Sequence, residues 1–167
     1  SISGGKGVRL TGNKLQEFVW MRQIFIGGNS SYPCIEINKG NNIYLSEIDT
    51  NDGAVGLLVQ NPNINGTTEV FNLFVNRFNS ARCNVGIKLV ADSGWLTRIK
   101  MSELTISAAT SAAILITKVT GGSYGFTECT FDNVNIDNMP SGAYAIQEDC
   151  MSNGIFTNIR TSSLIQV

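Results

Sequence analysis

Apolar side chains recur along this chain in two short patterns that alternate with each other. The first pattern is an apolar residue, any residue, an Asn, Glu or Gln, a second apolar residue, any residue, and Ile, Val or Thr. Self-similarity with a period of roughly 20–50 residues is typical of repeat architectures. Copies of this pattern lie at 21–26, 45–50, 70–75, 101–106, 131–136 and 156–161.

The second pattern is a small residue followed by apolar, any and apolar residues, and each copy lies between two copies of the first. Apolar residues two apart predict short strands with one buried face. No window shows the spacing of an amphipathic helix. We therefore expect 1–167 to form a single all-β domain, a solenoid of about six coils in which like strands stack into parallel sheets. Copies lie at 7–10, 34–37, 56–59, 86–89, 113–116, 143–146 and, more weakly, 163–167.

The first pattern breaks strict alternation once, because two residues separate its first two apolar positions. A strand must bend there to keep both side chains inward, and Asn suits the bend because it tolerates left-handed backbone. We expect Asn72, Asn133 and Asn158 to stack into an asparagine ladder. In the other copies the same position holds Gln23, Glu47 and Glu103.

The middle residues of the second pattern point outward and become apolar toward the C-terminal end. Leu58, Leu115 and Ile165 are expected in this outward column, together with Ala145, whereas Tyr144 is expected in the core. An exposed apolar strip often marks an interface, although a loop could also cover it.

Composition narrows the possible functions. Charged residues make up 15% of the chain and the net charge is −1, so there is no basic surface for nucleic acid. No apolar run is long enough to span a membrane. The four cysteines have no metal-ligand spacing and His is absent, so we expect no zinc site. We expect no metal and no cofactor; a calcium site at Glu128, Asp132 and Asp137 is the alternative. We expect the cysteines to be buried free thiols, with a Cys129–Cys150 disulfide as the alternative.

Paired carboxylates are the candidate catalytic groups. Glu47 and Glu103 hold equivalent positions two coils apart with Asn72 between them, about 9.6 Å at the coil spacing of ~4.8 Å. Side-chain adjustment would bring the carboxyl groups to the roughly 6.5–9.5 Å separation of inverting glycosidases. Asp132 is a further catalytic candidate, and Asp49 would lengthen an acidic groove. Alternatively, the two glutamates are solvated ladder residues.

Sugar recognition needs flat aromatic surfaces beside polar groups. Trp95 follows Asp92-Ser93-Gly94, so it is expected on a turn. With Asp49 and Asn72, the two tryptophans form our predicted substrate-binding set. The outward aromatic residues are Trp20, Phe71, Phe74 and Trp95.

The hexapeptide Phe-Asp-Asn-Val-Asn-Ile at 131–136 resembles the right-handed parallel β-helices of the pectate-lyase-like superfamily. The stretches Gly-Lys-Gly-Val-Arg-Leu-Thr-Gly (5–12) and Gly-Asn-Asn-Ile-Tyr-Leu (40–45) resemble those of bacteriophage tailspikes. The resemblance implies a homotrimer on a virion tail that binds, and often cleaves, host capsule, O-antigen or exopolysaccharide. Tyr124-Gly125-Phe126 is followed by Thr-Glu rather than the Asp-Pro-His of alginate epimerases, so that family's catalytic residues are missing.

The sequence therefore leaves two functions open for what we expect to be part of a longer tailspike-like chain. One is an extracellular domain that recognises a bacterial surface polysaccharide and, if it also cleaves it, does so by hydrolysis rather than elimination. The other is a non-catalytic shaft or adhesin segment of a trimeric viral fibre.

Overall fold

The computed structural model describes residues 7–10, 17–61, 70–92, 94–119, 125–161 and 164–166, and its regular elements are all β-strands. They form two sheets of unequal strand length. The short-strand sheet contains, in hydrogen-bonded order, β1 (Val8–Leu10), β3 (Pro33–Ile37), β5 (Val55–Gln60), β7 (Val85–Ala91), β9 (Ala112–Lys118), β12 (Tyr144–Glu148) and β15 (Leu164–Gln166). The long-strand sheet contains β2 (Glu17–Gly27), β4 (Gly40–Asn51), β6 (Val70–Ala81), β8 (Leu96–Ser107), β10 (Phe126–Thr127) with β11 (Thr130–Asp137), and β13 (Met151–Ser152) with β14 (Ile155–Thr161).

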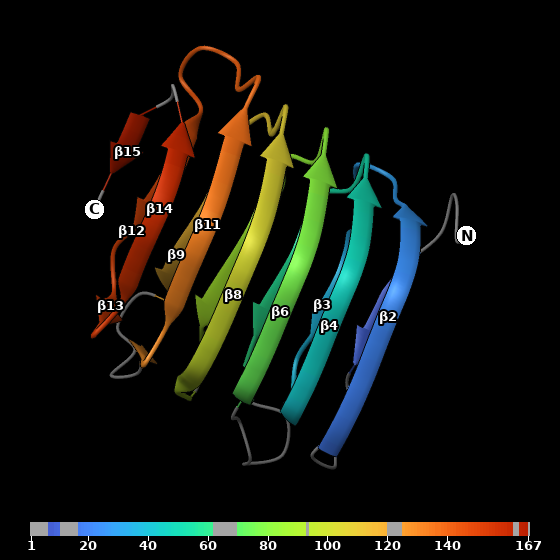
Figure 1. The fold of residues 1–167 in the computed structure, drawn as a ribbon, viewed down its shortest axis with the longest axis vertical. Helices are drawn as coiled ribbons and strands as arrows, with labels where there is room; N and C mark the ends of the chain where they lie inside the picture. Colours follow the sequence, from blue (N-terminus) through green and yellow to red (C-terminus); the bar gives the residue numbers. More distant parts are fainter. Residues whose placement is uncertain are drawn as a thin grey trace.

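Successive strands alternate between the two sheets, and every paired strand within a sheet is parallel to its neighbour. Figure 1 shows the long strands side by side, all pointing the same way, with the chain advancing from the N-terminal to the C-terminal end as it winds. The molecule is thus a right-handed parallel β-helix of about five complete turns, close to the six coils expected.

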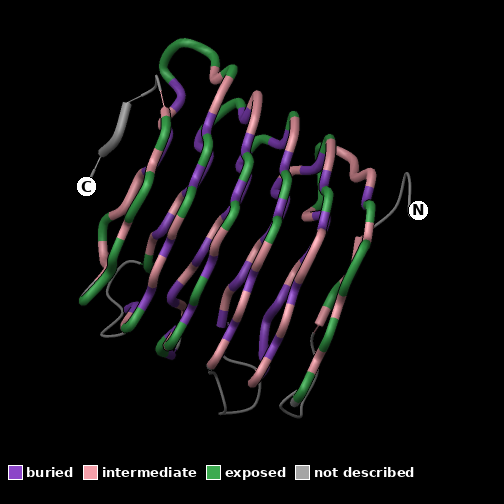
Figure 2. Tube along the Cα trace, in the orientation of Figure 1, coloured by how far each residue is buried: buried purple, intermediate pink, exposed green. Residues whose placement is uncertain are grey.

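The core lies between the sheets and is continuous along the axis. The inward residues of the central coils are almost completely buried, as Ile48, Leu73 and Leu104 illustrate at 0–1% exposure. Core residues of the first and last described coils are partly buried, and Figure 2 shows fewer buried residues along their long strands than along the central ones. These residues are Val8, Leu10, Val19, Met21 and Ile24 at one end and Met151, Phe156 and Ile159 at the other.

The long strands turn corners at residues with positive φ. Among the described residues, sixteen other than glycine have this geometry, and within a coil they lie five positions apart, as at Asn42, Glu47 and Asp52 (φ 55°, 56° and 58°). The predicted bend is confirmed at every expected position, including Glu47 and Glu103. Left-handed backbone costs an L-residue roughly 1–2 kcal/mol. The cost is tolerated because each corner stacks on the same corner of the next coil.

The alignment of one coil, however, differs from our prediction. Leu45 pairs with Val75 and then Met101, whereas Val70 pairs with Gly40. The copy at 70–75 is therefore displaced by five residues from its neighbours. The hexapeptide cannot show this, because corners recur every five residues within a coil.

The displacement corrects two expectations. Asn72 does not stack with Asn133 and Asn158, and instead its amide donates to Asn41 and Asn42 (3.0 and 3.1 Å). The residue between Glu47 and Glu103 is Arg77, not Asn72.

The apolar strip expected on the short-strand sheet is also absent from the described residues. The register shifts between Tyr144 and Ile146, so Ala145 is buried and Tyr144 is half-buried. Gln147 then follows Leu115 in the outward column, and Ile165 pairs with Ile146. The side chain of Ile165 lies outside the described residues. Lys88 separates the half-buried Leu58 and Leu115.

All four cysteines are free thiols; three are buried and Cys150 is partly buried, which confirms the sequence expectation and leaves Cys129 and Cys150 unbridged. The Cys34 thiol donates to the carbonyl oxygen of Asn51 (3.7 Å), and the neighbouring Cys83 thiol and burial raise its pKa. The thiols therefore serve as small apolar core groups.

We expect Asn133→Val to lower the free energy of unfolding by roughly 1–2 kcal/mol, because valine resists the left-handed corner (φ 52°). Asn133→Gly should stay within about 1 kcal/mol of wild type. Asn135→Val, at an exposed extended position of the same strand, is the control and should be tolerated. Urea unfolding measures all three; equal stability of the Asn133 variants would contradict the corner's role.

Candidate functional site

A groove of about 490 Å³ lies on the outer face of the long-strand sheet and crosses four coils. Its floor is formed by the backbone around Met21, Leu45 and Val75. Its two walls are the outward residues on either side of that floor. The aromatic wall holds Trp20, Tyr44, Phe74 and Lys100, and the polar wall holds Arg22, Ser46, Asn76 and Ser102.

The aromatic wall is a ladder of stacked rings. The ring centroids of Trp20 and Tyr44 are 4.9 Å apart, as are those of Tyr44 and Phe74, and the second pair is nearly parallel at 9°. The ladder forms because outward residues of adjacent coils are held about 4.8 Å apart, close to the aromatic stacking distance. Its free surfaces are the ring edges and the outer side of Trp20, which is 76% exposed.

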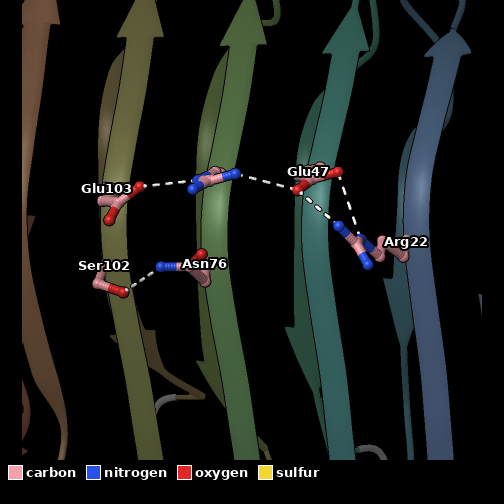
Figure 3. Close-up of polar contacts among 6 residues, drawn as sticks. Arg22, Glu47, Asn76, Ser102 and Glu103 are labelled. Carbon is pink, nitrogen blue, oxygen red and sulfur yellow. Dashed lines mark hydrogen bonds and ion pairs between the residues drawn. The ribbon is translucent and has the colours of Figure 1, made fainter.

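The polar wall offers hydrogen-bonding groups across from the rings. Asn76 donates from Nδ2 to Ser102 Oγ at 3.0 Å, as Figure 3 shows. This bond leaves the Asn76 carbonyl oxygen able to accept and the Ser102 hydroxyl able to donate. Ser46 lies on the coil between those of Arg22 and Asn76, and its hydroxyl group can donate or accept a hydrogen bond. The groove thus combines an apolar wall with a wall of donors and acceptors.

The second corner of the long strands lies beside the polar wall and includes Glu47, Arg77 and Glu103. We call the row of ion pairs that these residues form with Arg22 the charge ridge. Glu47 accepts hydrogen bonds from Arg22 at 3.2 and 3.4 Å and contacts Arg77 Nη1 at 3.0 Å. Arg77 Nε then contacts Glu103 at 3.2 Å. Figure 3 shows Glu47 and Glu103 on separate strands of the sheet, with Arg22 at one end of the ridge. The hydrogen bond from Arg22, with the charges of Arg22 and Arg77, lowers the pKa of Glu47.

The ridge bears directly on the predicted catalytic pair. Glu47 and Glu103 do share one face two coils apart, but the guanidinium of Arg77 occupies the space between them. A general acid near neutral pH needs a raised pKa, whereas that of Glu47 is lowered. The pair is therefore arranged as an ion-paired ladder, the alternative considered from the sequence.

Asp132, the third predicted catalytic residue, follows Ser102 on the next coil of the polar wall. It accepts hydrogen bonds from Thr157 Oγ1 (2.6 Å) and Asn158 Nδ2 (2.8 Å). These bonds lower the pKa of its carboxyl group. Asp132 is thus also held as a carboxylate, by hydrogen bonds from the next coil toward the C-terminus.

The predicted substrate-binding residues are not gathered in one place. Trp20 lines the groove, but Asp49 lies across the charge ridge, where it accepts a hydrogen bond from Asn79 at 2.7 Å. Asn72 lies at the first corner of the long strands, where its amide donates hydrogen bonds to Asn41 and Asn42. Trp95 lies in the turn before β8, is 41% exposed, and is not part of the groove lining. The side chain of Phe71 lies outside the described residues.

Sequence reasoning missed most of the groove, although a signal for it exists. The ladder residues each stand two positions after a residue of the first corner column, namely Phe18, Asn42 and Asn72. Counting from these corners would have aligned the aromatic residues. The residues missed are Arg22, Tyr44, Ser46, Asn76, Lys100 and Ser102.

Comparison with known proteins leaves the family open. No protein-family model matches the sequence, and neither the curated proteins nor the solved structures include a significant match. Within the described ranges, no group of three or more His, Cys, Asp or Glu residues could hold a metal ion, and no helix could cross a membrane.

The ion pairs predict how stability responds to acid. Because the pKa of Glu47 is lower in the folded protein, its contribution is present above the unfolded value of about 4.5 and is lost as pH falls below it. In Arg22→Gln, which removes the hydrogen bond that lowers it most, the pKa of Glu47 should rise toward that value, so the loss of stability between pH 7 and pH 3 should shrink. Urea unfolding at both pH values measures the change.

Arg160→Gln is the control, since Arg160 is exposed on β14, away from the charge ridge. It should retain the wild-type pH dependence. An Arg22→Gln protein with an unchanged acid response would show that the ridge does not lower the pKa of Glu47.

Proposed function

We propose that this chain is a carbohydrate-binding segment of a tailspike-like β-helix that recognises a bacterial surface polysaccharide, such as capsule, O-antigen or exopolysaccharide. The observation that carries the proposal is the groove with stacked aromatic rings on one wall and polar side chains on the other. As a pectate-lyase-like tailspike segment it would assemble as a homotrimer outside the cell, on a virion tail.

The chemistry of sugars supports this choice. A pyranose ring has an apolar C–H surface that packs on aromatic side chains and a rim of hydroxyl groups that need hydrogen-bond partners. Ligand sites with largely apolar walls and a few placed polar groups meet both needs. Because the walls repeat coil by coil, the groove continues along the helix axis. A polymer with repeating units suits it better than a compact ligand.

Binding without cleavage accords best with the charges around the groove. Hydrolysis requires one carboxyl group to donate a proton and a second to act as base or nucleophile. Glu47 and Glu103 are both paired with Arg77, and Asp132 is held as a carboxylate by Thr157 and Asn158. The residues predicted for acid–base chemistry are therefore committed to contacts between coils.

Trp20→Ala should weaken binding to a glycan identified on an array of bacterial capsules and lipopolysaccharides by about tenfold or more, since burying an aromatic surface contributes more than 1 kcal/mol. Phe25→Ala is the matched control: Phe25 is on the same strand and 51% exposed, but lies beyond the corner at Gln23. Isothermal titration calorimetry measures both. Equal losses in the two variants would place the binding surface elsewhere.

Incubation with the same glycan should release no reducing ends and no unsaturated sugars. Glu103→Gln should leave glycan affinity within about threefold and Glu47→Gln should not weaken it, because neither carboxylate lines the groove. If the wild type cleaves the glycan and either variant loses turnover while still binding, the depolymerase hypothesis replaces ours.

A shaft without its own ligand is the second candidate, and one set of contacts favours it. Ion pairs join adjacent coils at several places on the surface, including Arg82 with Asp52 (2.8 Å) and Arg98 with Glu128 (3.1 Å). Such ladders reinforce coil stacking rather than bind ligands. Absence of binding to every glycan on the array would favour this function.

A further inference from the structure

We infer that the groove selects a glycan carrying an anionic group and that Lys100 is the residue that recognises it. This inference rests on the proposed function, because it names the class of glycan bound at the same groove. The juxtaposition behind it is a cationic side chain that has no ion pair among the described residues, placed at the end of an aromatic ladder in a groove whose lining contains no carboxylate.

The charges of the lining are one-sided. Among its residues, Arg22 and Lys100 are cationic and none is acidic. An anion in the groove is therefore drawn to positive charge without meeting a negative wall. The low polarity of the ring ladder strengthens that attraction, since charges interact more strongly beside apolar material than in bulk water.

The two cations are not equivalent. Arg22 is committed to Glu47 by two hydrogen bonds, so its charge is largely compensated. Lys100 is exposed and, within the described part of the chain, has no ion pair. Binding an anion at Lys100 therefore breaks no existing contact. The ammonium group is a compact charge that suits a carboxylate or a phosphate.

The position of Lys100 links charge recognition to ring stacking. Phe74 packs against Tyr44 on one side, and on the other side the register places Lys100 where a fourth ring would continue the ladder. A sugar resting on the aromatic wall would thus bring a substituent within reach of the ammonium group. A neutral sugar would gain the stacking but not the ionic contact.

The carboxylates on the coils around Lys100 have partners of their own, as Glu128 has in Arg98. Glu47 and Glu103 face the guanidinium of Arg77 in the charge ridge. Asp132 lies one coil beyond Ser102 and accepts from Thr157 and Asn158. Its negative charge disfavours an anion farther along the axis. The favourable position for the anionic group is therefore beside Lys100.

The test compares glycans and variants in one titration series. The wild type is screened on an array containing uronate-, sialate- and phosphate-bearing glycans together with neutral ones. For each carboxylate-bearing hit, a second preparation has its carboxyl groups reduced to alcohols. Lys100→Gln, Lys100→Arg and the control Lys118→Gln are titrated with both preparations; Lys118 is an exposed lysine at the end of β9, outside the groove.

We expect the hits to be anionic, and Lys100→Gln to bind them about tenfold more weakly. Lys100→Arg should retain most of the affinity, and Lys118→Gln all of it. Reduction of the carboxyl groups should abolish the difference between wild type and Lys100→Gln, and added salt should shrink it. The glycans that bind on the array show whether the anionic group is a carboxylate or a phosphate.

Three outcomes would overturn the inference while leaving the proposed function intact: only neutral hits, unchanged affinity in a folded Lys100→Gln protein, or equal losses in Lys100→Gln and Lys118→Gln. Urea unfolding of each variant confirms that it is folded. Absence of any glycan hit is different, because it overturns the proposed function and this inference with it.

Discussion

A ladder of parallel backbone hydrogen bonds joins each coil to the next and sets the positions of all the other contacts in this molecule. It places each strand directly on its counterpart, about 4.8 Å away, so that equivalent side chains stack in columns. Apolar columns form the core, where residues such as Ile48, Phe78 and Leu104 are buried. Outward columns become ladders of rings, amides or alternating charges according to their residues. A side chain on this surface is thus defined by its neighbours one coil away more than by its neighbours in sequence.

The left-handed corners convert this stacking into shape. Each corner keeps residues on both of its sides pointing inward, so the long strands turn around the core without losing the ladder. Asn is an expected occupant, but Arg77, Glu47 and Arg98 also adopt the geometry. Their side chains point outward and find partners of opposite charge on the next coil, as Arg77 does with Glu47. Surface ion pairs contribute little individually, about 0–1 kcal/mol. Their contribution here is to favour one alignment of the coils.

The groove is a consequence of the same arrangement. Between two corner columns, each long strand presents two outward residues with one inward residue between them, and stacking turns these into two walls and a floor. The chemistry of each wall then depends on four residues from four coils. Aromatic rings align with aromatic rings, and hydroxyl and amide groups align opposite them. The carboxylates gather one column farther on, where arginines neutralise them, and this separates a potential binding surface from groups that could have been catalytic.

An all-β parallel solenoid, its inward apolar residues and the bends of its strands could be predicted from the sequence, because each depends on local alternation and on the left-handed preference of single positions. Which five-residue segment of one coil faces which segment of the next depends instead on contacts between coils. Sliding a coil by five residues leaves every inward and outward position unchanged, so the hydrophobic pattern is equally satisfied by both alignments. Contacts between coils, such as Asn72 with Asn42 and Arg77 with Glu47, distinguish them. For this reason Val70 was matched to the wrong neighbours, and the ring ladder became visible only in three dimensions.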